Sequence, residues 1–231
     1  TIKTVTINLN NAAKYYKEMP HQIAAWNFLE SKIPENILDE FADLYRAAPA
    51  NPSKSIITPE VMQRLTGHSA DKFDATFCTD FNKLLMASSF DKHIDCIAML
   101  TANLMHETGN FVWMKELADG SAYEFRSDLG NTEPGDGRKF KGAGVLMLTG
   151  RYNYSRCAER LHDPKILERG CDYVADQYPF RSALGWIEDN DLLNICLHQG
   201  FDACCYRVNG GWNGYDDRLA KYQICKKVFN V

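Results

Sequence analysis

The sequence predicts a mainly α-helical protein, and three features of the chain support this prediction. Apolar residues between positions 91 and 106 recur at helical spacing. Thr58 followed by Pro59 has the form of a helix start, with a hydroxyl N-cap and proline in the first turn. Residues 119–144 are polar and rich in glycine, but they also carry aromatic side chains. We therefore expect a long, ordered loop after the clearest helix.

The first 50 residues look separate from the rest. Alternating apolar residues at 5–9 predict a short strand, and residues 21–30 and 34–45 have amphipathic helical patterns. Residues 47–53 have the composition of a linker. We therefore expect an N-terminal appendage over residues 1–50 and a main domain over residues 56–231. The helices expected in the main domain, after the one starting at Pro59, are 73–86, 91–106, 152–161, 182–189 and 218–229.

Composition excludes several classes of function. The formal net charge of −4 argues against nucleic acid as the main partner. No run of about 18 apolar residues indicates a membrane span. The first residues lack the basic and then apolar layout of a secretory signal, so we expect no signal peptide.

The eight cysteines are expected to be buried, reduced thiols rather than disulfides. They form no CxxC pair, and the histidines are scattered, so the sequence predicts no metal site. Nothing in the chain indicates a cofactor.

Glu107 and Glu116 are the candidate catalytic pair. Glu107 ends the clearest helix, whose apolar character predicts a partly dry wall that favours the protonated form needed by a general acid. The chain then turns at Gly109, so Glu116 can face back across a cleft. Two carboxylates in different surroundings are the minimum needed to cleave a glycosidic bond. Spacing alone is a weak signal, because most such pairs are solvated surface groups.

Three segments taken together are far more specific: His106–Asn110 (HETGN), Lys141–Tyr154 (KGAGVLMLTGRYNY) and Asn209–Gly214 (NGGWNG) followed by Asp217 and Arg218. In this order they resemble family 19 glycoside hydrolases, which include plant-type chitinases and many bacteriophage endolysins. Intervening motifs resemble the phage and bacterial branch, and the resemblance covers about residues 56–231. It implies a lysozyme-like, bilobal α-helical domain with a cleft.

The resemblance assigns catalytic roles residue by residue. Glu107 matches the catalytic acid, Glu116 the base that activates water, and Thr149 the hydroxyl residue that helps to hold that water. The alternative for Thr149 is a simple helix cap. The family inverts stereochemistry, which requires a gap of about 6.5–9.5 Å between the two carboxyl groups.

Further residues are predicted to bind substrate or to support the site. Arg218 matches a late arginine that organises acidic side chains, and the Asn209 turn has the alternative of being only a turn. Trp186 and Trp212 are further stacking candidates, with core packing favoured for Trp186. The substrate-binding candidates are Asn153, Asn209, Trp113, Tyr123 and Arg218. The supporting candidates are His106 and Glu124. A structural role at the helix end is favoured over a catalytic one for His106, and an ion pair with Arg126 or Arg138 is favoured over a role as a second acid for Glu124.

Two positions depart from the family pattern. Ala143 stands where the family usually has arginine, and Met147 where it usually has glutamine. The arginine would help to keep a cleft carboxylate ionised, and the glutamine would hydrogen-bond an N-acetyl sugar. Methionine can only line a subsite. These departures predict reduced activity or a different wall chemistry.

The predicted function is peptidoglycan hydrolysis by an endolysin or a virion-associated lysozyme, acting on β-1,4 bonds by an inverting two-carboxylate mechanism. The alternatives are a chitinase acting on chitin oligomers and a catalytically weak, glycan-binding structural component of a virion. Peptidoglycan strands are the expected partner, and other virion proteins remain open. The expected location is the host cytoplasm until release to the wall, or the virion. Residues 1–50 would bind wall, dock to a virion or pack on the catalytic domain, with packing favoured by Trp26 and Phe28.

Overall fold

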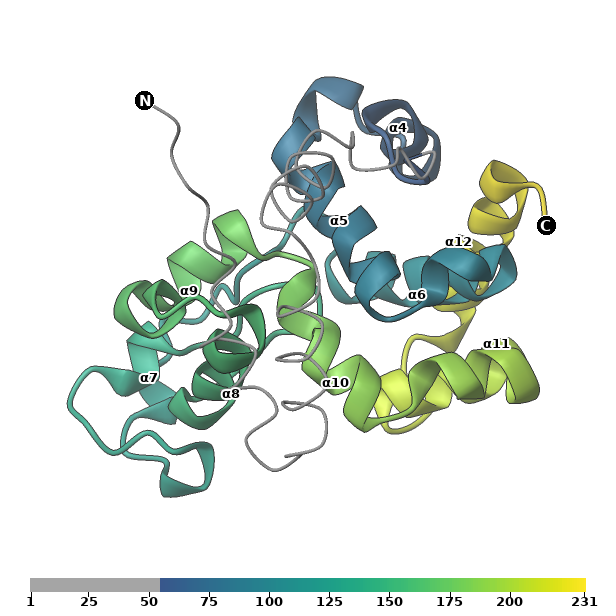
Figure 1. The fold of residues 1–231 in the computed structure, drawn as a ribbon. Coiled ribbons are helices and arrows are strands. Elements are labelled where there is room, and N and C mark those ends of the chain that lie inside the picture. Colours follow the sequence, from purple (N-terminus) through teal and green to yellow (C-terminus); the bar gives the residue numbers. More distant parts are fainter. Residues whose placement is uncertain (1–54) are drawn as a thin grey trace, which may run out of the picture. The chain divides into compact units, whose positions relative to one another are not determined.

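The chain divides between Lys54 and Ser55, and the computed structural model describes residues 55–231. The predictions made for residues 1–50, and for the linker at 47–53, lie outside the described residues. The described part is mainly α-helical, which confirms the predicted fold class (Figure 1). Its α-helices are α4 (Pro59–Thr66), α5 (Ala75–Ala87), α6 (Ile94–Glu107), α7 (Asp136–Lys139), α8 (Arg151–Leu161), α9 (Lys165–Gln177), α10 (Leu184–Asp189), α11 (Leu192–Asn209) and α12 (Tyr215–Phe229).

Side-chain caps start the first helices. The Thr58 hydroxyl accepts a hydrogen bond from the Val61 amide at 3.3 Å, and Pro59 opens α4, as predicted. The carboxylate of Asp74 accepts from the Phe77 amide at 2.8 Å and caps α5 in the same way. Each cap satisfies an amide that the helix itself leaves unpaired.

Two hydrophobic clusters form the core. The larger involves α4, α5 and α6 together with α10, α11 and α12. The smaller lies around α8 and α9 and includes Phe140, Ala143 and Tyr154. Figure 1 shows the same grouping, with α7, α8 and α9 on one side of α10 and α6, α11 and α12 on the other. We call the helices around the larger cluster the larger lobe and those around the smaller cluster the smaller lobe. The resemblance implies two such lobes.

Helix α6 is the central element of the larger lobe. It packs against α12 and α11, and nine of its residues are buried, from Cys96 to Met105. Polar side chains are rare on such a buried helix, yet Asn103 and Thr101 are fully enclosed. Because packing holds α6 on all sides, the position of its last residue, Glu107, is fixed by the core.

Helices α9 and α11 were not predicted. Each contains a glycine outside the helical region of φ and ψ, Gly170 at φ 67° and Gly200 at φ 82°. A Cβ atom on Gly170 would lie 2.3 Å from the carbonyl oxygen of Lys139, so this close approach between segments requires glycine. The two kinks interrupt the apolar periodicity that would reveal a long helix.

The segment 119–144 is an ordered loop, as expected. It contains the 3₁₀ turns η3 (Ser121–Tyr123) and η4 (Ser127–Leu129) and the short helix α7. Asp136, which is buried, accepts hydrogen bonds from the amides of Thr132 and Glu133, each at 3.0 Å. Its carboxylate also pairs with Arg151 at the start of α8. The loop is therefore anchored to the smaller lobe by a buried charge.

Three properties of residues 55–231 concern the predictions made for the cysteines, for membrane spans and for metal sites. All eight cysteines are free and buried, which matches the prediction of buried thiols. No described helix has the length and apolar character needed to cross a membrane. Within the same residues, no group of three or more histidine, cysteine, aspartate or glutamate side chains is arranged to hold a metal ion.

Candidate active site

Glu107 is the last residue of α6, and a buried arginine lies against its carboxylate. Nη2 of Arg218 donates a hydrogen bond to Oε1 of Glu107. The Glu107 side chain is 29% exposed, whereas that of Arg218 is 1% exposed. The prediction of an apolar wall behind Glu107 is therefore wrong, because a guanidinium occupies that position.

Arg218 is itself held by Asn103, one helical turn before Glu107. Nη1 of Arg218 donates to Oδ1 of Asn103 at 2.9 Å, and the amide nitrogen of Asn103 donates to the Met99 carbonyl at 2.9 Å. Nε of Arg218 is buried without a hydrogen-bond partner in the described residues. Burial rules out the direct sugar contact predicted for Arg218. Its predicted role of organising acidic side chains agrees with its contact to Glu107.

A compact turn connects Glu107 to the segment that carries Glu116. The Thr108 carbonyl accepts from the amides of Val112 and Trp113, at 3.0 and 2.9 Å. The Thr108 hydroxyl accepts from the Phe111 amide at 2.9 Å. These bonds close the turn, so the chain reverses its direction immediately after α6. The glycine at position 109 predicted a turn here.

Glu116 is fixed on the backbone of Gly142. The Glu116 amide donates to the Gly142 carbonyl at 2.9 Å, and the Gly142 amide donates to Oε2 of Glu116 at 3.1 Å. The hydroxyl of Tyr123 donates to Oε1 at 3.0 Å. Both carboxylate oxygens thus accept hydrogen bonds, which fix the orientation of the carboxylate. Glu107 and Glu116 therefore have different partners, as two carboxylates in different roles require.

Replacing Tyr123 with phenylalanine is expected to lower kcat about tenfold, because Glu116 loses one of its two orienting hydrogen bonds. Burial, together with the hydrogen bond to Glu116, raises the pKa of Tyr123, so the hydroxyl remains protonated and donates below about pH 10. The ratio of wild-type to variant kcat should therefore be constant from pH 5 to pH 9, measured by release of reducing ends. A ratio that varied across this range, or equaled one, would contradict this role.

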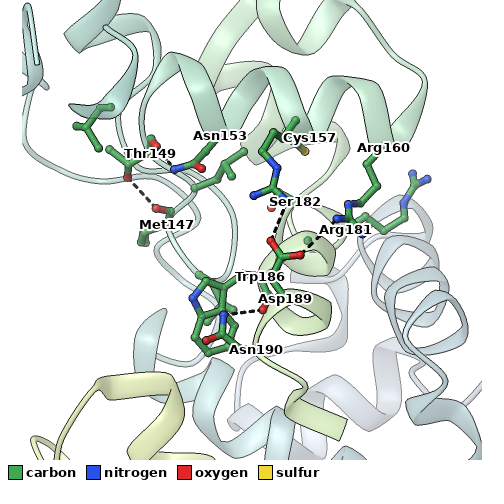
Figure 2. Close-up of a pocket in the computed structure, with 16 residues that line it drawn as sticks. Met147, Thr149, Asn153, Cys157, Arg160, Arg181, Ser182, Trp186, Asp189 and Asn190 are labelled. Carbon is green, nitrogen blue, oxygen red and sulfur yellow. Dashed lines mark hydrogen bonds and ion pairs between the residues drawn. The ribbon is translucent and has the colours of Figure 1, made fainter. Parts of the chain in front are cut away.

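Thr149 and Asn153 lie together at one pocket of about 300 Å³ (Figure 2). The Thr149 hydroxyl donates to the Met147 carbonyl at 2.7 Å, and the Asn153 amide donates to the Thr149 carbonyl at 2.8 Å. Thr149 does not cap α8, whose N-cap is Gly150, with no side-chain capping bond. The capping alternative for Thr149 is therefore excluded, and Met147 lines the pocket without closing it.

Gly142 lies between Glu116 and this pocket. A Cβ atom on Gly142 would lie 3.1 Å from Oε2 of Glu116 and 3.3 Å from Cβ of Met147. The neighbouring Ala143 is fully buried in the smaller hydrophobic cluster. The side chain at 143 thus contributes to packing in this protein. Only Gly142 separates the carboxylate of Glu116 from Met147 in the pocket wall.

The last sequence motif packs on the end of α6. Nδ1 of His106 lies 2.6 Å from Oδ2 of Asp217, and a Cβ atom on Gly214 would meet the His106 ring at 2.2 Å. Oδ1 of Asn209 accepts from the Asn213 amide at 3.1 Å, which closes a turn. The structure thus shows a turn at Asn209, and its sugar contact stays a prediction.

The tryptophans differ in their surroundings. Trp113 and Trp212 are about half exposed, and the Trp212 ring lies 5.4 Å from the rings of both Tyr206 and Tyr215. Both tryptophans therefore keep a free surface for stacking. Trp186 is partly buried against the larger cluster and also lines the pocket.

The ion pair predicted for Glu124 is wrong. Its carboxylate accepts hydrogen bonds from the backbone amides of Gly135 and Gly137, the latter at 2.8 Å. Arg126 pairs with Asp128 through two bonds of 2.6 and 2.7 Å, and Arg138 pairs with Asp119. Glycine amides at a tight turn are accessible donors. Glu124 therefore binds the loop backbone and does not pair with an arginine.

Two kinds of residue at the site were not predicted from the sequence. Asn103 was not singled out, although a polar residue one turn before Glu107 on an apolar helix was a usable signal. Arg156, Arg160 and Asp189, which line the pocket beyond Asn153, gave no signal, because the two segments meet only in the folded chain.

Comparison with known proteins identifies relatives in sequence. An endochitinase from Arabidopsis thaliana is 26% identical over 171 residues, which cover 71% of this chain and 59% of that protein. A second endochitinase from Arabidopsis thaliana is 30% identical over 139 residues, which cover 57% of this chain and 48% of that protein. The chain thus spans between about half and three fifths of the length of these relatives. No family model matches the sequence.

Solved structures share the fold. A bacterial family 19 chitinase superimposes with a TM-score of 0.57 at 14% identity, covering 76% of this chain and 96% of that chain. Chitinase C from Streptomyces griseus superimposes with a TM-score of 0.54 at 15% identity, covering 77% of this chain and 94% of that chain. At these identities the likeness concerns the fold.

Proposed function

We propose that this chain, whose sequence relatives are endochitinases and whose fold is like that of family 19 chitinases, is an inverting glycoside hydrolase that cleaves β-1,4 bonds of peptidoglycan. The observation that carries the proposal is the different anchoring of two carboxylates on either side of one tight turn. Glu107 contacts a buried guanidinium, while Glu116 accepts from a backbone amide and a phenol.

Two carboxylates with different partners can divide the roles of acid and base in this reaction. Arg218 bonds to Oε1 of Glu107, so Oε2 is the oxygen that would deliver a proton to the glycosidic oxygen. Glu116 would take a proton from a water molecule as that water attacks the anomeric carbon from the opposite face. The Thr149 hydroxyl donates its own proton to Met147, which leaves its lone pairs to accept from the same water. Attack from the opposite face inverts the anomeric configuration.

One observation supports peptidoglycan over chitin as the substrate. Charged side chains continue the pocket beyond Asn153, although chitin itself carries no charge. Chitin remains the second candidate, because the sequence relatives are named endochitinases.

The biological setting that we propose is wall lysis by a bacteriophage, as a free endolysin or as part of the virion. The motifs between the main blocks, which resemble the phage and bacterial branch, support this setting. Peptidoglycan strands are the proposed partner, with the host cytoplasm or the virion as the proposed location before the wall is reached.

A digest analysed by two methods tests the proposal. The full chain is incubated separately with peptidoglycan sacculi and with chitin hexamers. Mass spectrometry identifies the bond cleaved, and proton NMR records the first anomer released. We expect fragments from sacculi, with the α-anomer appearing first. Release from chitin alone would favour the chitinase, release from neither would support a binding-only protein, and an initial β-anomer would exclude the inverting mechanism.

A further inference from the structure

We propose that the pocket beside α8 binds a carboxylate group carried by the glycan, so that the chain recognises acidic, muramic-acid-containing substrates in preference to neutral ones. This inference rests on the proposed function, because it names the substrate class of the same site. It concerns the part of the pocket beyond Asn153, which we call the arginine pocket. Its principal side chains are Arg156, Arg160, Trp186, Asp189 and Asn190.

The arginine pocket is continuous with the candidate active site. Asn153, Arg156, Cys157 and Arg160 fall on one face of α8 at helical spacing and line the same cavity. Figure 2 shows Thr149 and Asn153 at one end of this cavity and Arg160, Arg181 and Asp189 toward the other. A substituent on a sugar bound near Thr149 would therefore extend along α8.

The lining of this cavity has an excess of positive charge. Three arginines line it, namely Arg156, Arg160 and Arg181, against one carboxylate, that of Asp189. Arg156 pairs with Asp189 at 2.9 Å, and Arg160 contacts Glu188 and also lies 3.8 Å from Asp189. Apart from Asp189, the charged side chains that face the cavity itself are therefore the three arginines.

Arg156 and Arg160 pair only with partly exposed carboxylates, whereas Arg181 is committed to the fold. The side chains of Arg156 and Arg160 are 46% and 30% exposed, and those of their partners Asp189 and Glu188 are 45% and 42% exposed. Pairs this exposed are weak and exchange partners readily. Arg181, in contrast, pairs with buried Asp80, which also accepts from the amide of Phe180 at 2.8 Å.

The chemistry of two arginines selects the ligand class. A guanidinium binds a carboxylate through two parallel hydrogen bonds, a geometry that a neutral hydroxyl or acetamido group does not match. In peptidoglycan the lactyl group of muramic acid carries a free carboxylate where the stem peptide is absent. Where the peptide is present, it is joined to that carboxyl through an amide bond, and the carboxylates lie along the peptide instead. The opposite wall holds Trp186 and Asn190, whose amide donates to the Trp186 carbonyl at 2.9 Å. This wall can pack against the carbon skeleton of the substituent.

Binding of three soluble disaccharides tests the inference without relying on hydrolysis. The probes are N-acetylglucosaminyl-N-acetylmuramic acid, the same disaccharide bearing its stem peptide, and di-N-acetylchitobiose. Affinities of the full chain and of the double variant Arg156→Gln/Arg160→Gln are measured by calorimetry. The pair of substitutions Arg64→Gln/Lys72→Gln, at two exposed cations, is the matched control for the loss of two charges. Thermal unfolding checks that each variant folds.

We expect the double variant to bind the acidic probes about tenfold more weakly and to bind chitobiose unchanged. Weakening with the peptide-free acidic probe alone would identify the lactyl carboxylate as the ligand, and weakening with the peptide-bearing probe alone would identify a carboxylate of the stem peptide. Weakening with both would show that the arginine pocket accepts either carboxylate. Equal affinities of wild type and double variant for the acidic probes, an equal loss for chitobiose, or no binding by wild type would overturn the inference. A chain that binds selectively but cleaves no glycan would contradict only the proposed function.

Discussion

Replacing Glu107 with glutamine is expected to lower the rate of glycan hydrolysis by about 10³-fold, which removes detectable lysis. The amide cannot deliver a proton to the glycosidic oxygen, but it has almost the same shape and keeps an oxygen that can accept from Arg218. The measurement is the fall in turbidity of outer-membrane-permeabilised Gram-negative cells, together with release of reducing ends from purified sacculi.

The matched control for this variant is Glu168→Gln, an exposed glutamate on α9. It changes the net charge of the chain by the same amount and is expected to retain full activity. Thermal unfolding of the Glu107 variant should show a folded protein. Retention of more than about a tenth of the wild-type rate by a folded Glu107→Gln protein would exclude Glu107 as the general acid.

Replacing Arg218 with methionine is expected to destabilise the domain by about 3 kcal/mol and to lower hydrolysis as well. The change leaves the Glu107 carboxylate without its cation and the buried Asn103 oxygen without its donor. For a protein of this size, the loss corresponds to a fall in the midpoint of thermal unfolding of roughly 6–12 °C. Calorimetry of wild type and variant measures it, and Arg218→Lys should recover part of the stability through its retained charge.

A double-mutant cycle separates the contact between Arg218 and Glu107 from general packing. If the two side chains stabilise one another, Arg218→Met should cost less in the Glu107→Gln background than in wild type. Additive losses of unfolding free energy would show that the Arg218 side chain stabilises the domain without its contact to Glu107, through packing and its hydrogen bond to Asn103. In that case the orientation of Glu107 would need another explanation.

Local chemistry made several elements of this fold predictable. Thr58 and Pro59 start α4 because the hydroxyl satisfies a free amide and proline fits the first turn. Apolar spacing identified α6, and a turn after Glu107 followed from the glycine at 109. Helices α9 and α11 were missed because glycines at their kinks break the periodicity on which prediction depends.

The candidate site was predictable only as a set of residue types. The sequence by itself determined which side chains have acid, base and sugar-binding chemistry, and its motifs placed Glu107, Glu116 and Thr149 among them. The contacts of these side chains depend on segments far apart in the chain. Arg218 lies 111 residues after the Glu107 that it contacts, and Glu124 bonds to glycine amides rather than to the neighbouring arginine.

Tertiary structure alone decided which groups surround each carboxylate and how the pocket continues. It brought Asp189 of α10 to Arg156 of α8, and it put a guanidinium where the apolar character of α6 predicted a dry wall. The physical reason is that caps and periodicity act over one or two turns of backbone, whereas burial and charge pairing depend on which segments the core brings together.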